Sequence, residues 1–154
     1  MKHTSYILLL TSYIAAAATF CSCDKVPING DLDGMWQIVT IQTPDGTRNV
    51  KSNQAYLSFQ LHLSQWDMDH GSKRYYAHFS HSNDSIIFYD FKHDSLHRSK
   101  ADDNEEITND EMTKEKVLDA WGVHNLDARY HVQRLNGDEL ILERADTILF
   151  FRKF

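Results

Sequence analysis

The chain has 154 residues, of which 42% are hydrophobic and 25% are charged, a length and composition suited to one packed domain rather than a disordered chain. Its 22 acidic and 16 basic residues give a formal net charge of −6, which argues against nucleic acid as a partner because nucleic-acid binding uses clustered Lys and Arg. After the first 24 residues, no apolar run is long enough to cross a membrane.

Residues 1–22 predict a lipoprotein signal peptide. Lys2 supplies the positive charge at the start, and the apolar run over residues 6–20 has the length of a signal peptide but is too short for a membrane span. Ser22-Cys23 resembles the lipobox of bacterial lipoproteins, in which the cysteine is acylated and becomes the new N-terminus. Cys21 is the poorer candidate because the bulky Phe20 precedes it. We therefore expect lipid attachment at Cys23, with ordinary secretion or an uncleaved anchor as the alternatives.

Lipidation would leave the mature protein without a free thiol. Cys21 would leave with the signal peptide and Cys23 would become a thioether, which excludes cysteine catalysis and Cys-based zinc sites in the mature protein. Several acyl chains on one residue hold a protein stably at a membrane surface. The expected location is the cell envelope, anchored to the outer membrane, with the periplasmic and surface faces both open. Residues 23–33 would then form the lipidated N-terminus and its tether.

One folded domain is expected over residues 34–154. The β-branched alternation of residues 36–43 predicts its first strand, and Pro44-Asp45-Gly46 predicts the turn that closes it. Residues 55–66 predict the clearest strand, because apolar and polar side chains alternate along it. Its buried face is expected to carry Leu57, Phe59, Leu61 and Leu63.

The later elements are predicted in the same way. A helix near residues 109–121 is indicated by the capping pattern Thr108-x-x-Glu111 and by an apolar stripe that includes Leu118 and Trp121. Asn136-Gly137 is a strong hairpin signal. Further strands are expected at residues 73–80, 85–91, 128–135, 139–144 and 147–154.

Seven to eight antiparallel strands in sequence order, with one short helix, favour an all-β up-and-down barrel. Short turns and strands with one buried face suit this architecture, and closure removes exposed strand edges. An open sandwich is the structural alternative.

Several motifs carry a family resemblance. Gly34-x-Trp36 on the first strand is similar to the opening motif of lipocalins and related calycin barrels, Leu118-x-x-Trp121-Gly122-Val123 precedes a strand, and the chain closes with residues 149–154 (LFFRKF). Together with the lipobox, these motifs resemble the small lipocalin-like lipoproteins of Bacteroidetes over roughly residues 30–154. The resemblance implies a calycin-type barrel with a cavity of uncertain use.

The resemblance also implies how the barrel is closed. In lipocalins, the tryptophan of the first strand closes one end and an arginine from the last strand lies across it; here the matching residues are Trp36 and Arg152. A guanidinium over an indole gains about 1–2 kcal/mol of cation–π attraction when it is shielded from water. The alternative is that Trp36 is an ordinary core residue and Arg152 is solvated.

Nine histidines raise a metal or haem hypothesis. His62 and His78 fall on the predicted polar faces of successive strands, so their rings would come close if those strands pair. No His-Glu-x-x-His motif is present, and the acidic patch within residues 102–111 lacks the spacing of an EF-hand. Scattered surface histidines and a solvated acidic loop are the simpler interpretation, so we expect no metal and no cofactor.

Catalytic signatures are absent from the sequence. There is no Gly-x-Ser-x-Gly elbow, and the carboxylates are too numerous for spacing to select a pair. We therefore expect that the protein is not an enzyme.

Three tripeptides resemble the acceptor motif of the O-glycosylation system of Bacteroidetes, in which Asp precedes Ser or Thr and an apolar residue follows. They predict acceptors at Ser85, Ser95 and Thr147, with Ser95 the most accessible. The alternative is that Asp-Ser and Asp-Thr simply begin strands after turns.

The interior of the barrel allows two interpretations. The interior of an eight-stranded barrel is just wide enough for side chains or for one small ligand. The first hypothesis is a lipid-anchored envelope protein that binds a small apolar or amphipathic ligand. The second is a filled barrel that serves as a structural or interaction module of an envelope complex, and the third is haem or metal capture through surface histidines. Predicted lining residues are Phe59, Leu61, Tyr75, Phe79, Phe88 and Phe150; no protein partner or oligomeric state is indicated.

Overall fold

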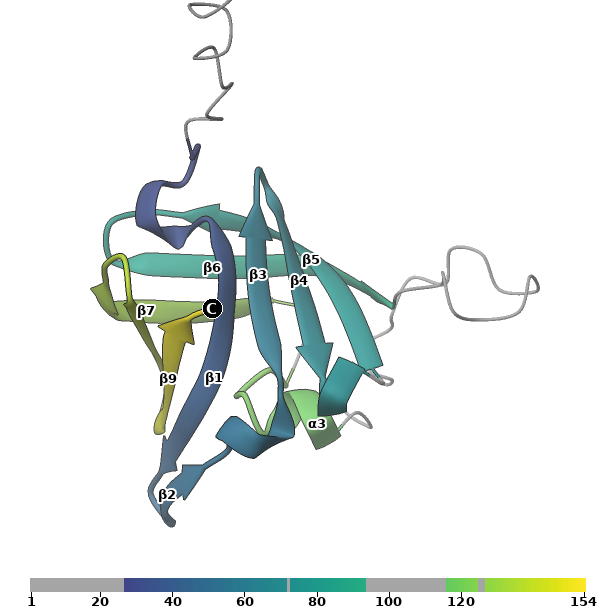
Figure 1. Cartoon of the computed structure of the whole chain (residues 1–154), viewed down its shortest axis with the longest axis vertical. Coiled ribbons are helices and arrows are strands. Elements are labelled where there is room, and N and C mark those ends of the chain that lie inside the picture. The colour runs from purple at the N-terminus through teal and green to yellow at the C-terminus, as the bar shows by residue number, and fades with distance from the viewer. Residues whose placement is uncertain (1–26, 72, 94–115, 125–126) are drawn as a thin grey trace, which may run out of the picture.

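The computed structural model describes residues 27–71, 73–93, 116–124 and 127–154 (Figure 1). Cys23, Ser95 and most of the predicted helix 109–121 lie outside these residues. The described elements, in chain order, are the 3-10 helix η1 (Gly30–Leu32), β1 (Gly34–Thr43), β2 (Gly46–Asn49), the 3-10 helix η2 (Lys51–Asn53), β3 (Tyr56–Gln60), β4 (Leu63–Met68), the 3-10 helix η3 (Asp69–Gly71), β5 (Lys73–His81), β6 (Ser85–His93), the α-helix α3 (Lys116–Asp119), β7 (Ala128–Leu135), β8 (Glu139–Arg144) and β9 (Thr147–Lys153).

The strands form a closed antiparallel barrel. From β3 to β9 each strand pairs with the next in sequence, and β1 pairs with both β3 and β9, which closes eight strands into a ring. The ninth strand, β2, pairs with the second half of β1, from Thr40 opposite Asn49 to Thr43 opposite Gly46. The predicted up-and-down barrel is confirmed, and it carries an additional strand that the sequence did not predict.

The predicted strand over residues 55–66 is wrong, because the chain turns in the middle of it. β3 ends at Gln60 and β4 begins at Leu63 as its antiparallel partner. At the turn, Leu61 has a left-handed backbone with a φ of 57°. The turn also reverses which residues face inward: Phe59 is buried before it and Ser64 after it, whereas Leu61 is 56% and Leu63 43% exposed.

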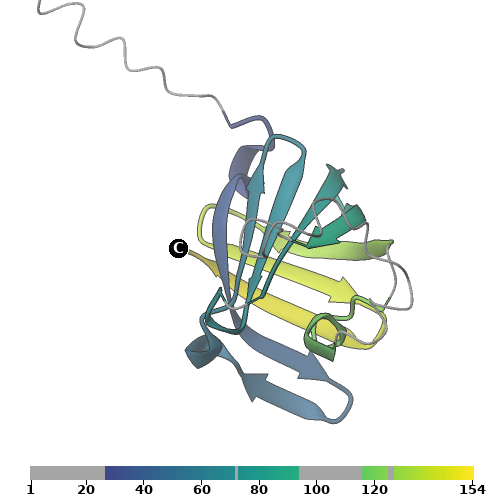
Figure 2. The same ribbon diagram turned by 90° about the vertical axis from the view of Figure 1, so that its right-hand side faces the viewer.

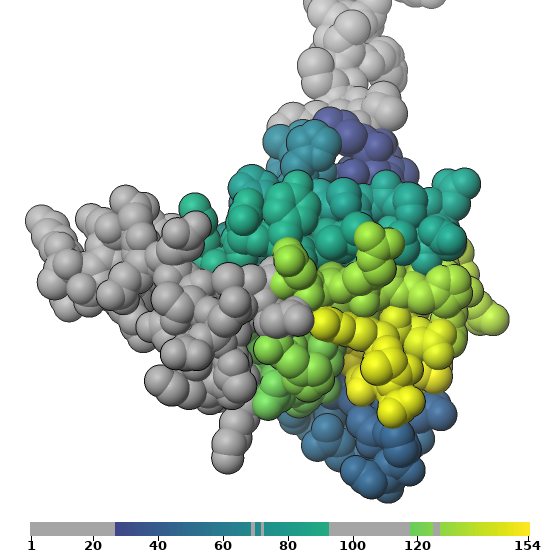
Figure 3. All heavy atoms as spheres, turned by 180° about the vertical axis from the view of Figure 1, so that it is seen from behind, coloured from purple at the N-terminus to yellow at the C-terminus, as the bar shows by residue number. Residues whose placement is uncertain are grey.

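Large aromatic side chains dominate the interior. The aromatic residues among the largest fully buried side chains come from β1 and from β3 to β7: Trp36, Trp66, Tyr75, Tyr130, Phe59, Phe88 and Phe91. Seen from behind in Figure 3, the strands of residues 73–93 (teal) lie against those of residues 128–154 (green to yellow), consistent with the pairing of β6 with β7.

The two ends of the barrel differ. We call the end formed by residues 27–33 and the β3–β4 turn the tether end, because residues 27–33 belong to the expected tether; α3 and β2 lie at the opposite end in both Figure 1 and Figure 2. At the tether end, η1 buries Leu32 completely, so ordered structure begins before the predicted start at Gly34. At the other end, Tyr130 on β7 donates a hydrogen bond of 2.5 Å to the Trp121 carbonyl and holds the turn after α3. Within the described residues, no helix is long and apolar enough to span a membrane.

Candidate functional site

Aromatic rings fill the centre of the barrel and contact one another. Phe59 meets Phe79 edge-on, with ring centroids 5.0 Å apart, and Phe88 meets Trp66 at 4.8 Å. Trp66 continues the series to Trp121 at 5.4 Å. Edge-to-face and tilted contacts at these distances are the favourable arrangement of aromatic side chains. The sequence analysis expected these aromatic residues to line a ligand cavity. In the fold, their rings instead pack against one another.

Four of the six predicted lining residues are buried inside the barrel: Phe59, Tyr75, Phe79 and Phe88. The other two are placed elsewhere. Leu61 lies in the exposed β3–β4 turn, and Phe150 is half-buried on the outer side of β9, where it lines a shallow groove with Val39 and Ile141. The inward aromatic residue of β9 is its neighbour, Phe151.

Side chains alternate between the inner and outer faces along β9, and this alternation decides which cation closes the barrel. Arg152 shares the outer face of β9 with Phe150, and its Nε donates to Gln37 Oε1 at 2.9 Å. Lys153 shares the inner face with Phe151, and its Nζ lies 4.2 Å from the ring centroid of Trp36. The expected pair of Trp36 and Arg152 is thus replaced by Trp36 and Lys153.

The Lys153 ammonium is held by more than the indole. It donates hydrogen bonds to the backbone carbonyls of Asp31 at 2.7 Å and Asp33 at 2.5 Å, while Trp36 Nε1 donates to the Leu32 carbonyl at 2.8 Å. Partial burial lowers the pKa of Lys153, and the nearby carboxylates of Asp31 and Asp33 act in the opposite direction. Together these contacts fasten η1 across the tether end.

Gly34 is required at this closure, which explains the Gly-x-Trp motif in physical terms. Its φ is +113°, a backbone conformation that side chains with a Cβ rarely adopt. A Cβ built there would also lie 3.1 Å from Lys153 Cε. The glycine therefore lets β1 begin directly beneath the lysine.

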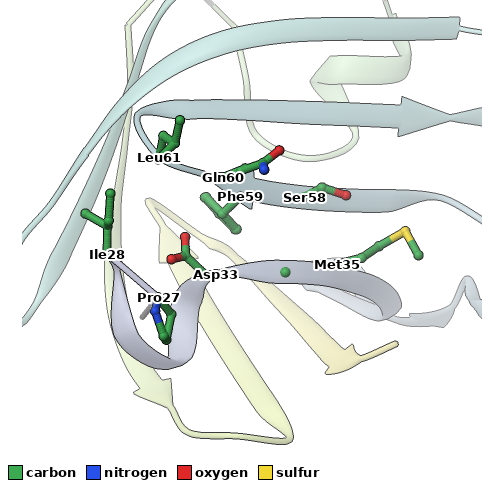
Figure 4. Close-up of a pocket in the computed structure, with 9 residues that line it drawn as sticks. Pro27, Ile28, Asp33, Met35, Ser58, Phe59, Gln60 and Leu61 are labelled. Atoms are coloured by element: carbon green, nitrogen blue, oxygen red, sulfur yellow. The ribbon is translucent and has the colours of Figure 1, made fainter. Parts of the chain in front are cut away.

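An apolar groove opens on the outside of the tether end. It runs between the N-terminal segment and β3 and has a volume of about 610 Å³, within the roughly 300–1,000 Å³ that is common for small-ligand sites. Figure 4 shows Ile28 and Leu61 at one end of the groove and Met35 at the other, with Phe59 between the two strands. The described residues that line it are Pro27, Ile28, Asp33, Gly34, Met35, Ser58, Phe59, Gln60 and Leu61.

Hydrogen bonds fix the two walls of this groove relative to each other. Asn29 Nδ2 donates to the Leu61 carbonyl at 2.8 Å and to Asp33 Oδ1 at 2.6 Å, and the Asn29 backbone N–H donates to Asp33 Oδ2 at 3.1 Å. One asparagine thus links the N-terminal segment to the β3–β4 turn. The sequence analysis placed Asn29 within the tether of residues 23–33 and missed this role.

Two of the described histidines, His62 and His78, had been considered as metal or haem ligands. His62 lies in the β3–β4 turn, and His78 lies on β5 with its ring stacked on Tyr89 at a centroid distance of 5.8 Å. No group of three or more His, Cys, Asp or Glu side chains that could hold a metal ion occurs among the residues the structure describes.

Two of the three predicted glycosylation acceptors are described. The Ser85 hydroxyl lies 2.9 Å from the Ser82 hydroxyl at the β5–β6 turn, and Thr147 is the first residue of β9. Both are partly exposed. Modification at Ser85, Ser95 or Thr147 stays a prediction.

With the barrel and its closure established, the comparison with known families is decisive. The sequence matches the lipocalin-like domain family over residues 18–154. The chain belongs to the lipocalin-like family. Membership confirms the resemblance inferred from Gly34-x-Trp36 and the closing segment.

Solved structures show the same lipocalin-like fold. A lipocalin-like protein from Bacteroides uniformis ATCC 8492 matches with a TM-score of 0.56 at 22% identity, covering 81% of this chain and 100% of that one. An uncharacterized protein from Bacteroides eggerthii DSM 20697 matches with a TM-score of 0.57 at 22% identity, over 80% and 99% of the two chains. A protein from Burkholderia xenovorans matches with a TM-score of 0.50 at 16% identity, over 80% and 83%. No curated protein matches the chain.

Proposed function

We propose that this lipocalin-like protein is a lipid-anchored envelope protein that binds a slim apolar or amphipathic ligand on the outside of its barrel. The observation that carries the proposal is the contrast between the two candidate sites. Inside the barrel, Phe59, Phe88 and Trp66 contact one another directly. Outside, the groove at the tether end offers apolar walls, a suitable volume and an open entrance.

The chemistry of the groove selects the class of ligand. Ile28, Met35 and Leu61 present aliphatic and thioether surface, which favours a hydrocarbon chain through burial of apolar area. The polar side chains at its margin, Ser58 and Gln60, suit a ligand with one polar end. A single acyl chain with a small head group has this combination, whereas a bulky ring system needs a deeper cavity.

The proposed anchoring is supported by the lipobox at Ser22-Cys23 and by its place in the chain. The first described element, η1, begins at Gly30, only a few residues further on. The role is binding rather than catalysis: the groove combines an apolar surface with a carboxylate, Asp33, that is already engaged by Asn29.

Dodecanoic acid is a suitable probe, measured by native mass spectrometry on residues 24–154. We expect one molecule to bind the unmodified domain, and Leu61→Gln to weaken binding at least fivefold because Leu61 lines the groove. Leu63→Gln is the matched control, since Leu63 is an exposed leucine of the same hairpin that does not line the groove. Equal binding by both variants would overturn the assignment of the groove, and so would the absence of binding to the unmodified domain.

A further inference from the structure

Exposed aliphatic side chains gather at the tether end. Among the described residues, four large hydrophobic side chains are exposed, and three of them lie at this end: Ile28 at 62%, Leu61 at 56% and Leu63 at 43%. We call these three residues the aliphatic patch. The fourth, Phe154, packs edge-on against Tyr56 with ring centroids 5.2 Å apart.

We propose that the aliphatic patch is a membrane-contact surface, which rests the tether end of the barrel on the lipid bilayer. This inference rests on the proposed lipid anchor at Cys23. It goes beyond anchoring because it assigns an orientation: the β3–β4 turn touches the bilayer, and α3 and β2 point away from it.

The length of the chain before the domain supports a bilayer as the occupant. Cys23 is separated from Pro27 by four residue steps, which reach at most about 14 Å when fully extended. An acylated Cys23 must lie at the membrane surface, so Pro27 lies within that distance of it. Ile28 is the next residue, and one hydrogen bond from Asn29 to the Leu61 carbonyl joins it to the β3–β4 turn.

The patch is also built in advance of contact. Asn29 fixes the N-terminal segment to the turn, and Figure 4 places Ile28 and Leu61 at the same end of the groove. The left-handed backbone of Leu61, with a φ of 57°, is uncommon for a large side chain. In a turn exposed to water, a polar residue or glycine would adopt this backbone more readily. The leucine at position 61 is therefore explained by contact of its side chain with an apolar environment.

Charge decides which kind of bilayer fits. Asp31 is exposed at this end, and the Lys153 ammonium is already engaged by two backbone carbonyls and the Trp36 ring. The end therefore offers no free cluster of cations for anionic head groups among the described residues. A zwitterionic surface, rich in phosphatidylethanolamine, is the expected partner.

The test uses the full chain, acylated by its bacterial host and reconstituted in phosphatidylethanolamine–phosphatidylcholine vesicles. A bimane fluorophore is placed at Leu61→Cys, at Leu63→Cys and, as the control, at Asp45→Cys in the exposed β1–β2 turn of the opposite end. Lipids that carry a nitroxide near the head group then quench any fluorophore at the bilayer surface. We expect quenching at positions 61 and 63 to be at least twofold stronger than at position 45.

The outcomes distinguish a failure of the proposed orientation from a failure of the proposed lipid anchor at Cys23. The vesicles are first floated in a density gradient. If the chain does not float with them, both the anchor at Cys23 and the orientation are overturned. A chain that floats, but whose three positions are quenched equally, would overturn the orientation alone. Positions 61 and 63 that react with maleimide in vesicles but are protected in cells would identify a protein as the occupant, against the inference. Near-ultraviolet circular dichroism checks that each variant keeps the buried tryptophans in place.

Discussion

Replacing Lys153 with methionine tests the closure of the barrel. Methionine keeps most of the aliphatic stem but removes the ammonium that binds the Asp31 and Asp33 carbonyls and faces Trp36. The bond to Asp31 is exposed and the bond to Asp33 is partly buried, so only the second is expected to approach the ~1.5–3 kcal/mol of a charged hydrogen bond. The cation–π contact adds about 0.5–1 kcal/mol. We expect the free energy of unfolding to fall by about 2–3 kcal/mol.

Urea unfolding of residues 24–154, followed by tryptophan fluorescence, measures this loss. At an m-value of about 2 kcal/mol/M, the middle of the usual range, the midpoint should fall by about 1–1.5 M. Arg152→Met is the matched control. Its guanidinium is exposed and bonds only the Gln37 side chain in the described contacts, so we expect a loss below about 1 kcal/mol. If Arg152→Met destabilised the barrel as much as Lys153→Met, the assignment of the closing cation to Lys153 would be refuted.

Three further predictions concern single residues. Gly34→Ala should cost at least about 1 kcal/mol, since alanine disfavours the left-handed backbone and its Cβ would lie 3.1 Å from Lys153 Cε; an unchanged thermal midpoint would contradict this. Ser64→Ala should cost about 1–3 kcal/mol, because Ser64 Oγ accepts the buried Trp66 Nε1–H at 3.1 Å, and urea unfolding would show it. Partial burial lowers the pKa of His81 below its usual 6.5, so the unfolded chain binds a proton before the folded chain as the pH falls, and stability drops below about pH 7. His81→Gln should lose less stability than the unmodified domain between pH 7 and pH 5, and parallel curves would refute the role of His81.

The strand pattern of the barrel was predictable because a strand with one buried face alternates apolar and polar residues in the sequence. This held for β5 to β8, where the predicted and observed strands agree closely. It failed at the β3–β4 turn because apolar residues continue to alternate through Leu61 and Leu63, which hides a turn that carries no glycine, asparagine or proline. The exposed Leu61 and Leu63 break the usual pattern for a turn, and they are two of the three residues of the proposed membrane contact.

One error of phase accounts for both misplaced residues of the last strand. Leu149, Phe150 and Phe151 are consecutive and all apolar, so alternation cannot say which of them faces inward. A shift of one residue moves every side chain of a strand to its other face. The sequence analysis turned Phe150 and Arg152 inward, whereas the fold turns Phe151 and Lys153 inward. Pairing with β1, which contains a register shift between Ile38 and Thr40, fixes this choice and cannot be read from β9 alone.

The site was less predictable than the fold because it joins distant parts of the chain. The groove depends on the contact of Asn29 with Leu61, 32 residues away. Phe59 and Leu61 were both predicted to line an inner cavity. Phe59 is buried in the barrel and also forms part of the groove floor, whereas Leu61 lines only the outer groove. Their apolar side chains marked them as candidates for a ligand site, but only the turn between β3 and β4 determined on which side of the barrel Leu61 lies.

The pairing of β1 with β9 has a consequence for how the barrel forms. The hydrogen bond between Gln37 and Arg152 joins residues 115 positions apart, whereas hairpins such as β7–β8 form between neighbours in sequence. Contacts between distant residues require a large loss of chain entropy before they contribute, and they slow folding. We therefore expect a late, rate-limiting step in which β9 reaches β1, and until then both strands expose unpaired edges. Refolding in the presence of a peptide of residues 147–154 should reveal this interval, because the peptide would compete for β1 only while the ring is open.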